Sequence, residues 1–259
     1  MTISPPDDLD RRVFAISLWQ ETMVKAAYTV GRFQPPTLGH VRMIDALLEK
    51  ADGAPAYVFV SSAKDSLITP ELKIEFLTKM LTRDGVFPKN LTLVNTKTCT
   101  TPCGGPLGGW GFLKEKGLMG PEVLLVVGGD QRDKFDPNTA GMWSTTEKAE
   151  RPSMSTIERS GTGAATFSST KAREALGLSG AAGLKPFLMD KSNAVTDKDV
   201  ARMATELLAV KDKWPKKKTG GGDEDLSAFD EDLDGGRRRK TRRKSRFIRK
   251  KRISIHKRR

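Results

Sequence analysis

The chain has 259 residues, of which 37% are hydrophobic and 30% are charged, so it is long enough to bury one sizeable core beside an appended segment. Its formal net charge is +13, but residues 237–259 contain fifteen Lys and Arg and no acid. Subtracting those fifteen charges from +13 leaves −2 for the other 236 residues, which excludes a broadly basic surface on the folded part.

The N-terminal extension, residues 1–25, lacks a basic start followed by an apolar run. The sequence has no stretch of eighteen consecutive apolar residues, so we expect neither a signal peptide nor a transmembrane helix. Cys99 and Cys103 are predicted to be two free thiols in a loop, because a secreted domain held by disulfides normally has more cysteines. A zinc site is disfavoured, since His40 and His256 are the only histidines. We therefore expect an intracellular protein in a reducing compartment.

Short apolar runs alternate with helix-like patterns between Ala26 and Leu178, which is typical of a parallel sheet covered by helices. The run Val123–Val127 is apolar throughout, as expected of a central strand buried on both faces. Apolar residues at helical spacing predict crossover helices around 41–48 and 72–80. The predicted fold class is α/β, a Rossmann-like open parallel sheet with helices on both faces. The predicted strands are Ala26–Val30, Ala56–Ser61, Leu91–Thr96, Val123–Val127 and Ser153–Ile157.

Other segments lack such patterns or follow the sheet. Residues 98–111 are rich in Thr, Pro and Gly and predict a loop, and residues 136–152 show no clear periodicity. Asp197–Trp214 has apolar residues at helical spacing, which predicts a terminal helix and extends the domain over residues 26–214. Residues 215–259 form an acidic linker and a basic C-terminal tail, a composition that predicts disorder.

The segment Gly31–His40, GRFQPPTLGH, directly follows the first predicted strand and precedes the first predicted helix. Such a turn lies at the carboxyl edge of a parallel sheet, where open α/β folds bind ligands. Gly31 and Gly39 permit close approach to the backbone, and His40 lies at a helix start, where amides favour anions. His40 is therefore a candidate for stabilising charge on a phosphate group. The alternative is a proline-rich turn whose histidine only caps the helix.

The segment Phe167–Leu176, FSSTKAREAL, passes from hydroxyl residues to a helix-forming run, so one of its three hydroxyl residues should cap a helix. The sequence offers no Glu or Gln three residues later to complete a capping box, which leaves the helix-end amides to another acceptor. Lys171 and Arg173 add positive charge to the helix start, where the macrodipole disfavours it by up to about 1 kcal/mol. A bound polyphosphate would offset that cost. An ordinary N-cap with solvated basic residues is the alternative.

Together, the two segments resemble the two signatures of the HxGH nucleotidyltransferase superfamily, roughly (H/T)xGH and a Ser-Ser-Thr-x-x-Arg element near the end of the domain. Their order and separation make the pair much more specific than either half. Gly31–His40 is most similar to nicotinamide-nucleotide adenylyltransferases, whose first motif often reads Gly-Arg-Phe-Gln-Pro. The resemblance covers residues 26–178. It implies transfer of a nucleoside monophosphate from a triphosphate to a phosphorylated acceptor, with release of pyrophosphate.

Two further segments are similar to the family. Residues 61–65 and 69–73 resemble a loop and helix start that carry a basic residue, here Lys73, near the nucleotide. Val127–Asp130 resembles the Gly-x-Asp at the end of the fourth strand, where the aspartate lies beside the nucleoside; a turn that ends a buried strand is the alternative. Thr37 departs from the pattern, because it stands where HxGH has its first histidine. Its hydroxyl can donate to phosphate, but His40 is then the single imidazole where HxGH provides two.

The resemblance implies that the acceptor's phosphate attacks the α-phosphate in line, while the protein positions reactants and neutralises charge. His40 would stabilise the transition state with help from Thr37, and Mg²⁺ would bridge triphosphate oxygens, although the sequence displays no dedicated carboxylate cage. The residues expected to bind the nucleotide are Gly31, Arg32, Phe33, Gly39, Lys73, Gly128, Asp130, Ser168, Ser169, Thr170 and Arg173.

The identity of the substrates is less constrained than the reaction. We favour ATP with nicotinamide mononucleotide because of Gly-Arg-Phe-Gln-Pro, and CTP with a phosphorylated alcohol is the runner-up, because cytidylyltransferases share both phosphate motifs. A hypothesis of another class is a nucleic-acid-binding protein with a degenerate nucleotidyltransferase scaffold, Thr37 being a sign of decay. The joint presence of His40, the Ser-Ser-Thr element and Arg173 argues against it.

The basic tail, residues 237–259, interleaves apolar residues with its fifteen charges, which suits salt-dependent binding to nucleic-acid phosphates. The same residues suit a nuclear localisation signal or an acidic membrane surface, and a solvated tail without a partner is the alternative. The acidic run at 223–234 is able to fold back on the tail. The residues expected to contact nucleic acid are Arg237, Arg238, Arg239, Lys240, Arg242, Arg243 and Lys244.

Overall fold

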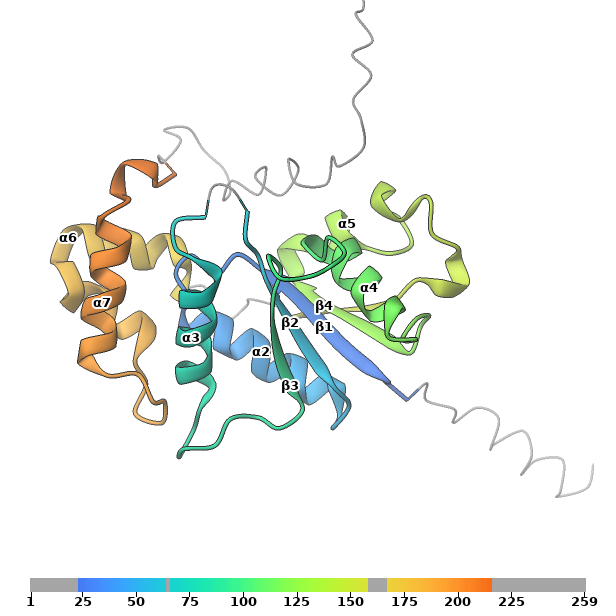
Figure 1. Ribbon diagram of the computed structural model, residues 1–259, viewed down its shortest axis with the longest axis horizontal. Helices are drawn as coiled ribbons and strands as arrows, with labels where there is room; N and C mark the ends of the chain where they lie inside the picture. Colours follow the sequence, from blue (N-terminus) through green and yellow to red (C-terminus); the bar gives the residue numbers. More distant parts are fainter. Residues whose placement is uncertain (1–22, 64–65, 158–166, 216–259) are drawn as a thin grey trace, which may run out of the picture. The chain divides into compact units, whose positions relative to one another are not determined.

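A five-stranded parallel sheet lies at the centre of the computed structural model, which describes residues 23–63, 66–157 and 167–215 (Figure 1). The strand order is β3-β2-β1-β4-β5. Each predicted strand is confirmed, with ends that differ by at most one residue. The expectations for the N-terminal extension before residue 23, and for the tail and its nucleic-acid contacts, lie outside the described residues. The strands are β1 (Ala26–Gly31), β2 (Ala56–Val60), β3 (Leu91–Asn95), β4 (Val123–Gly128) and β5 (Ser153–Ile157).

The strand order reverses direction between β1 and β4, which are neighbours in the sheet although about a hundred residues separate them. Ala26 pairs with Val123 and Tyr28 with Leu125. The carboxyl ends of these two strands therefore lie side by side. Open parallel sheets bind ligands at such a point, so the segments that follow β1 and β4 are the ones placed for function.

Four helices share the large apolar core on one face of the sheet (Figure 1). Their buried residues, such as Val41, Ile44 and Leu47, recur at helical spacing and pack with Ala27 and Val58 of the sheet. This confirms the two predicted crossover helices. The helices are α2 (Leu38–Ala51), α3 (Pro70–Leu81), α6 (Ser169–Leu188), which is kinked at Gly180, and α7 (Asp197–Leu208). Of these, α2 and α3 lie on the strands, and α6 and α7 pack against each other on the outer side of these two helices (Figure 1).

The other face carries α4 (Gly105–Glu115), so the sheet is covered on both faces, as predicted (Figure 1). The prediction of a loop over 98–111 is wrong for its last seven residues. The helical pattern of α4 is difficult to recognise in the sequence, because glycine occupies a position where the helix packs closely on the sheet. A Cβ on Gly109 would lie 3.0 Å from the ring of Phe59, and the hydroxyl of Tyr28 donates to the carbonyl of Pro106 at 3.0 Å.

Residues 129–152 follow β4 and contain only short helices, which agrees with the missing periodicity of 136–152. Trp143 is fully buried there and packs edge-on against Trp110 of α4, with ring centroids 6.0 Å apart. This segment is therefore held to α4 by aromatic packing. Its short helices are η1 (Gly129–Gln131), α5 (Arg132–Phe135), η2 (Gly141–Trp143) and η3 (Lys148–Glu150).

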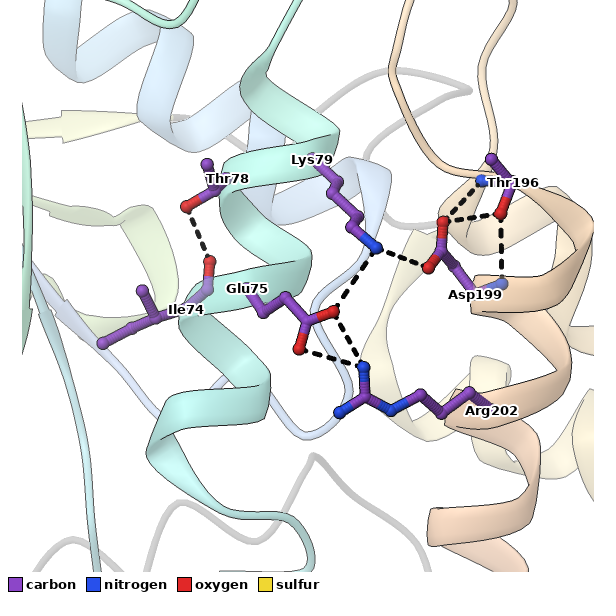
Figure 2. A network of polar contacts seen from close by, with 7 residues as sticks. All are labelled: Ile74, Glu75, Thr78, Lys79, Thr196, Asp199 and Arg202. Atoms are coloured by element: carbon purple, nitrogen blue, oxygen red, sulfur yellow. Dashed lines mark hydrogen bonds and ion pairs between the residues drawn. The ribbon is translucent and has the colours of Figure 1, made fainter.

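The terminal helix α7 is shorter than predicted, because it ends at Leu208 and is followed by the turn η5 (Lys211–Lys213). The indole N–H of Trp214 donates to the carbonyl of Leu207 at 3.1 Å, so the chain folds back on the helix end. Polar contacts between Lys79 and Asp199 join α7 to α3 (Figure 2). Among the described residues, no helix combines the length and apolar character needed to cross a membrane.

Cys99 and Cys103 form a disulfide, so the prediction of two free thiols is wrong. The turn before α4 brings their Cα atoms to 6.1 Å, a separation that a disulfide spans. Cys103 is fully buried, and its backbone lies against Gly108 of α4. The expectation of a reducing compartment rests on the low number of cysteines, and this disulfide does not support it.

Candidate functional site

The first motif leaves β1 at Gly31 and turns back to start α2 at Leu38. Phe33 has a left-handed backbone, with φ of 49°, and its ring is 1% exposed. A Cβ on Gly31 would lie 2.5 Å from Cζ of Phe33, so Gly31 is needed to seat this ring. The ring of Phe33 also packs against the ring of His40, with centroids 4.9 Å apart. The turn is thus built to hold the imidazole.

The Nδ1 atom of His40 accepts a hydrogen bond from the backbone N–H of Thr37, at 3.0 Å. Because a backbone amide only donates, Nδ1 is unprotonated and the neutral ring carries its proton on Nε2. The histidine does cap α2, as the alternative interpretation of the sequence held. The cap uses Nδ1, and it fixes Nε2 as the protonated nitrogen of the neutral ring, a donor that suits an anion.

Thr37 is fully buried, and its hydroxyl lies 3.0 Å from Nδ1 of His40. Its hydroxyl therefore faces the imidazole. The sequence leaves a hydrogen bond from this hydroxyl to phosphate possible and assigns Thr37 to assist His40, and its contact with Nδ1 is one way in which it can assist.

The second motif begins α6 after Ser168, whose hydroxyl accepts from the amide of Lys171 at 3.2 Å. A serine therefore caps this helix, as predicted, but the amide of Lys171 is not left to another acceptor. The macrodipole at this end still favours an anion.

Hydrogen bonds join the second motif directly to the first. The hydroxyl of Ser169 donates to the carbonyl of Pro35 at 2.9 Å, across 134 positions of sequence. The guanidinium of Arg173 donates to the carbonyl of Gln34 and, at 3.3 Å, to the hydroxyl of Thr170. The two motifs therefore lie in direct contact, as expected if they belong to one site.

Lys73 lies in α3 and is fully buried. Its ammonium donates to the carbonyl of Ser61 at 2.9 Å and to the hydroxyl of Ser66 at 2.8 Å. Sequence reasoning missed Ser61, Ser66 and Gln34, whose side-chain amide donates to the hydroxyl of Ser66 at 3.3 Å. The available signal was the group of hydroxyl residues directly after β2, at the carboxyl end of the sheet.

The remaining predicted residues lie at the same edge of the sheet. Gly128 ends β4 and is buried, whereas Asp130 follows in η1 and is exposed. Arg32 directly follows β1 and is partly exposed, and Gly39 is the second residue of α2. No group of three or more His, Cys, Asp or Glu within the described ranges is arranged to hold a metal ion.

A comparison with protein families agrees with the paired motifs. Residues 28–175, more than half of the chain, match the family described as cytidylyltransferase-like. A search of curated proteins gives no match. A solved structure with 12% sequence identity and a TM-score of 0.43 is a bifunctional NMN adenylyltransferase/ADP ribose pyrophosphatase from Francisella tularensis, complexed with AMP and a Mn ion. The match covers 73% of the present chain and 53% of that protein, so the chain spans about half of its length.

Proposed function

The chain belongs to the cytidylyltransferase-like family of nucleotidyltransferases, and we propose that it transfers the AMP moiety of ATP to a phosphorylated acceptor, with release of pyrophosphate. One observation carries this proposal: Ser169 and Arg173 bond to the carbonyls of Pro35 and Gln34, in the turn that presents His40. A helix N-terminus, a guanidinium and an imidazole donor thereby meet at the carboxyl edge of the sheet. Such a set of donors suits a polyphosphate.

His40 is the residue that we assign to the transition state. Its Nε2–H would donate to an oxygen of the α-phosphate as negative charge develops during in-line attack by the acceptor's phosphate. Thr37 would act by keeping Nδ1 occupied and the ring in place. No covalent enzyme intermediate is needed, since the protein has to align the reactants and neutralise charge.

The second motif would hold the β- and γ-phosphates. Ser169, Thr170 and Arg173 lie at or near the first turn of α6, where the macrodipole also favours negative charge. Mg²⁺ would be bound mainly by oxygens of the triphosphate, because the described part of the chain has no cage of carboxylates or histidines. It would supply further neutralisation of the charge that develops on the phosphates. Gly128 and Asp130, at the end of β4, would lie beside the nucleoside.

The Gly-Arg-Phe-Gln-Pro sequence of the first motif supports ATP as the donor and nicotinamide mononucleotide as the acceptor. CTP with a phosphorylated alcohol is the second candidate, because it would use the same phosphate contacts. The test is pyrophosphate release by the full-length chain with Mg²⁺. Each of ATP and CTP is combined with nicotinamide mononucleotide, phosphocholine or glycerol 3-phosphate.

Two His40 variants separate catalysis from folding. His40→Gln keeps a side chain that can cap α2 at its third position, so its melting temperature should stay near that of the native chain. Its turnover should fall by about 10² to 10³, the usual cost of removing such a donor. His256→Ala, which changes the only other histidine, is the matched control and should keep full activity. A native chain that is folded yet inactive with every pair would favour the degenerate scaffold.

We also propose, from the sequence alone, that the basic tail binds nucleic acid without sequence preference. Its affinity for duplex DNA should fall steeply between about 50 and 200 mM salt. Replacing Arg237, Arg238, Arg239 and Lys240 with glutamine should lower the slope of log affinity against log salt by about three to four. An unchanged slope would argue for a tail that serves an import receptor or has no partner.

A further inference from the structure

A charged side chain that is fully enclosed stands next to the proposed triphosphate site. Lys73 has no exposed surface, and an ammonium in such a place is tolerated only when hydrogen bonds replace its hydration. Two of them go to Ser61 and Ser66, which stand on either side of residues 64–65. The structure assigns Lys73 a positioning role: it acts on the triphosphate site through Ser66 and Gln34 and does not itself contact phosphate. This inference rests on the proposed function.

Lys73 is linked to the side chain of Gln34 through Ser66, and we call this series of hydrogen bonds, Lys73–Ser66–Gln34, the relay. The hydroxyl of Ser66 accepts from the ammonium at 2.8 Å and from Nε2 of Gln34 at 3.3 Å. The orientation of the Gln34 amide is fixed, because its Oε1 accepts from the backbone N–H of Leu67 at 3.3 Å and that group can only donate. Both polar atoms of the Gln34 side chain are thus bonded to residues 66–67, and Lys73 is bonded to the same segment through Ser66.

From Gln34, the connection continues through the main chain of the first motif. The carbonyl of Gln34 accepts from Arg173, and the next carbonyl, of Pro35, accepts from Ser169. A shift of Gln34 would therefore also displace the two carbonyls to which Arg173 and Ser169 of the second motif are bonded. Lys73 also holds the carbonyl of Ser61, whose own amide donates to the carbonyl of Gly31 at 2.9 Å. The start of the turn that presents His40, at Gly31, and its middle, at Gln34, are in this way both linked to one buried ammonium.

Direct binding of phosphate by Lys73 fits this geometry poorly. A phosphate oxygen could reach the ammonium only if the side chains that enclose it separated, because Lys73 has no exposed surface. The basic residue expected near the nucleotide is therefore present at the predicted position, but its charge points into the protein.

The kinetic test uses Lys73→Met, Ser66→Ala and the double variant in the full-length chain. Methionine fills the site of the lysine without its charge, and Ser66→Ala removes the relay while Lys73 remains. We expect each single change to lower kcat/KM for the triphosphate by at least about tenfold, with KM for the acceptor unchanged. The double variant should be no worse than Lys73→Met by more than about twofold, because both changes break the same relay. Native kcat/KM in Ser66→Ala would overturn the proposal and favour direct contact.

Amide hydrogen exchange tests the relay without any turnover. In the free protein, both single variants should exchange faster than the native chain in peptides spanning residues 31–40. Thr78→Ala is the matched control, because Thr78 lies on the same helix and its side-chain hydroxyl donates to the carbonyl of Ile74, which takes no part in the relay (Figure 2). It should change neither exchange there nor kcat/KM. Exchange rates at 31–40 that equal those of the native chain in both Lys73→Met and Ser66→Ala would refute the relay. If instead the native chain shows no turnover, the proposed function is refuted, but the exchange measurement still tests the relay.

Discussion

Replacing Asp199 with asparagine should destabilise the fold by about 1–2 kcal/mol at neutral pH. Asp199 is 8% exposed, and its carboxylate lies 2.5 Å from the ammonium of Lys79 (Figure 2). Its other oxygen accepts from the backbone N–H and the hydroxyl of Thr196 at 2.9 and 2.7 Å, which caps α7. A hydrogen bond between charged groups contributes about 1.5–3 kcal/mol. The lower range applies, because the Lys79 side chain is 33% exposed and keeps a second partner, Glu75, at 3.3 Å.

The effect should depend on pH in a defined direction. Burial acts to raise the pKa of Asp199, but hydrogen bonds from Lys79 and Thr196 outweigh it and hold that pKa below its usual 3.8. A carboxyl group with a lowered pKa in the folded state stabilises the protein above its unfolded pKa, and that contribution is lost as pH falls through the folded pKa. The hydrogen bond to Asp199 raises the pKa of Lys79 above 10.5, so the pair persists to alkaline pH. The deficit of the variant should thus be constant from about pH 5 to 9 and shrink below about pH 4.

Urea unfolding at a series of pH values measures this difference, and thermal unfolding should show a melting temperature lower by about 2–8 °C. The matched control is Glu75→Gln, in the same network but 36% exposed in its side chain, which should cost less than about 1 kcal/mol. The reasoning fails if Asp199→Asn unfolds at the native midpoint at pH 7, or if its deficit is undiminished at pH 3.

Two further predictions concern the site. Gly31→Ala should destabilise the fold by about 1–3 kcal/mol and lower turnover, because its methyl group would lie 2.5 Å from the ring of Phe33. Urea unfolding midpoints measure the loss of stability. The control is Gly111→Ala, in open space within α4, which should instead stabilise the fold by about 0.5–1 kcal/mol. Equal midpoints for the two variants would contradict it. Arg173→Lys keeps the charge but loses the fork that reaches both Gln34 and the helix start, so kcat/KM for the triphosphate should fall at least about tenfold while the melting temperature changes little. A decrease of less than twofold would mean that charge alone suffices.

The sequence predicted the central strands because they are buried on both faces, which leaves an apolar run as clear as Val123–Val127. Helix α4 was missed for the opposite reason. Its buried positions include Pro106 and Gly109, which have little or no apolar side chain to mark a helical period. The close approach of Gly109 to Tyr28 and Phe59 requires such a small residue, and only the packed structure displays that requirement.

Within the site, motif order predicted which segments meet but not how they are joined. His40, Ser169 and Arg173 were identified because their side-chain chemistry is visible in the sequence. Ser169 and Arg173 donate to the carbonyls of Pro35 and Gln34, and His40 accepts from the backbone N–H of Thr37. Such backbone groups are present whatever the side chain, so no residue pattern could indicate them. The charge at position 73 was visible as well, but whether a lysine faces solvent or the core depends on its neighbours in the fold.

The positive charge at the start of α6 was first interpreted as a cost that a bound anion would offset. The structure weakens that interpretation, because the guanidinium of Arg173 already donates to the carbonyl of Gln34 and the hydroxyl of Thr170. These bonds themselves offset part of the cost. The argument for an anion rests instead on the combined set of donors, in which His40 is the one whose protonated nitrogen the hydrogen bonds define. The Thr37 amide occupies Nδ1 and thereby leaves the proton on Nε2, so the ring is prepared as a donor before any ligand binds. A site with one imidazole can then still align a triphosphate, since a buried threonine fixes that imidazole and hydrogen bonds join its turn to the second motif.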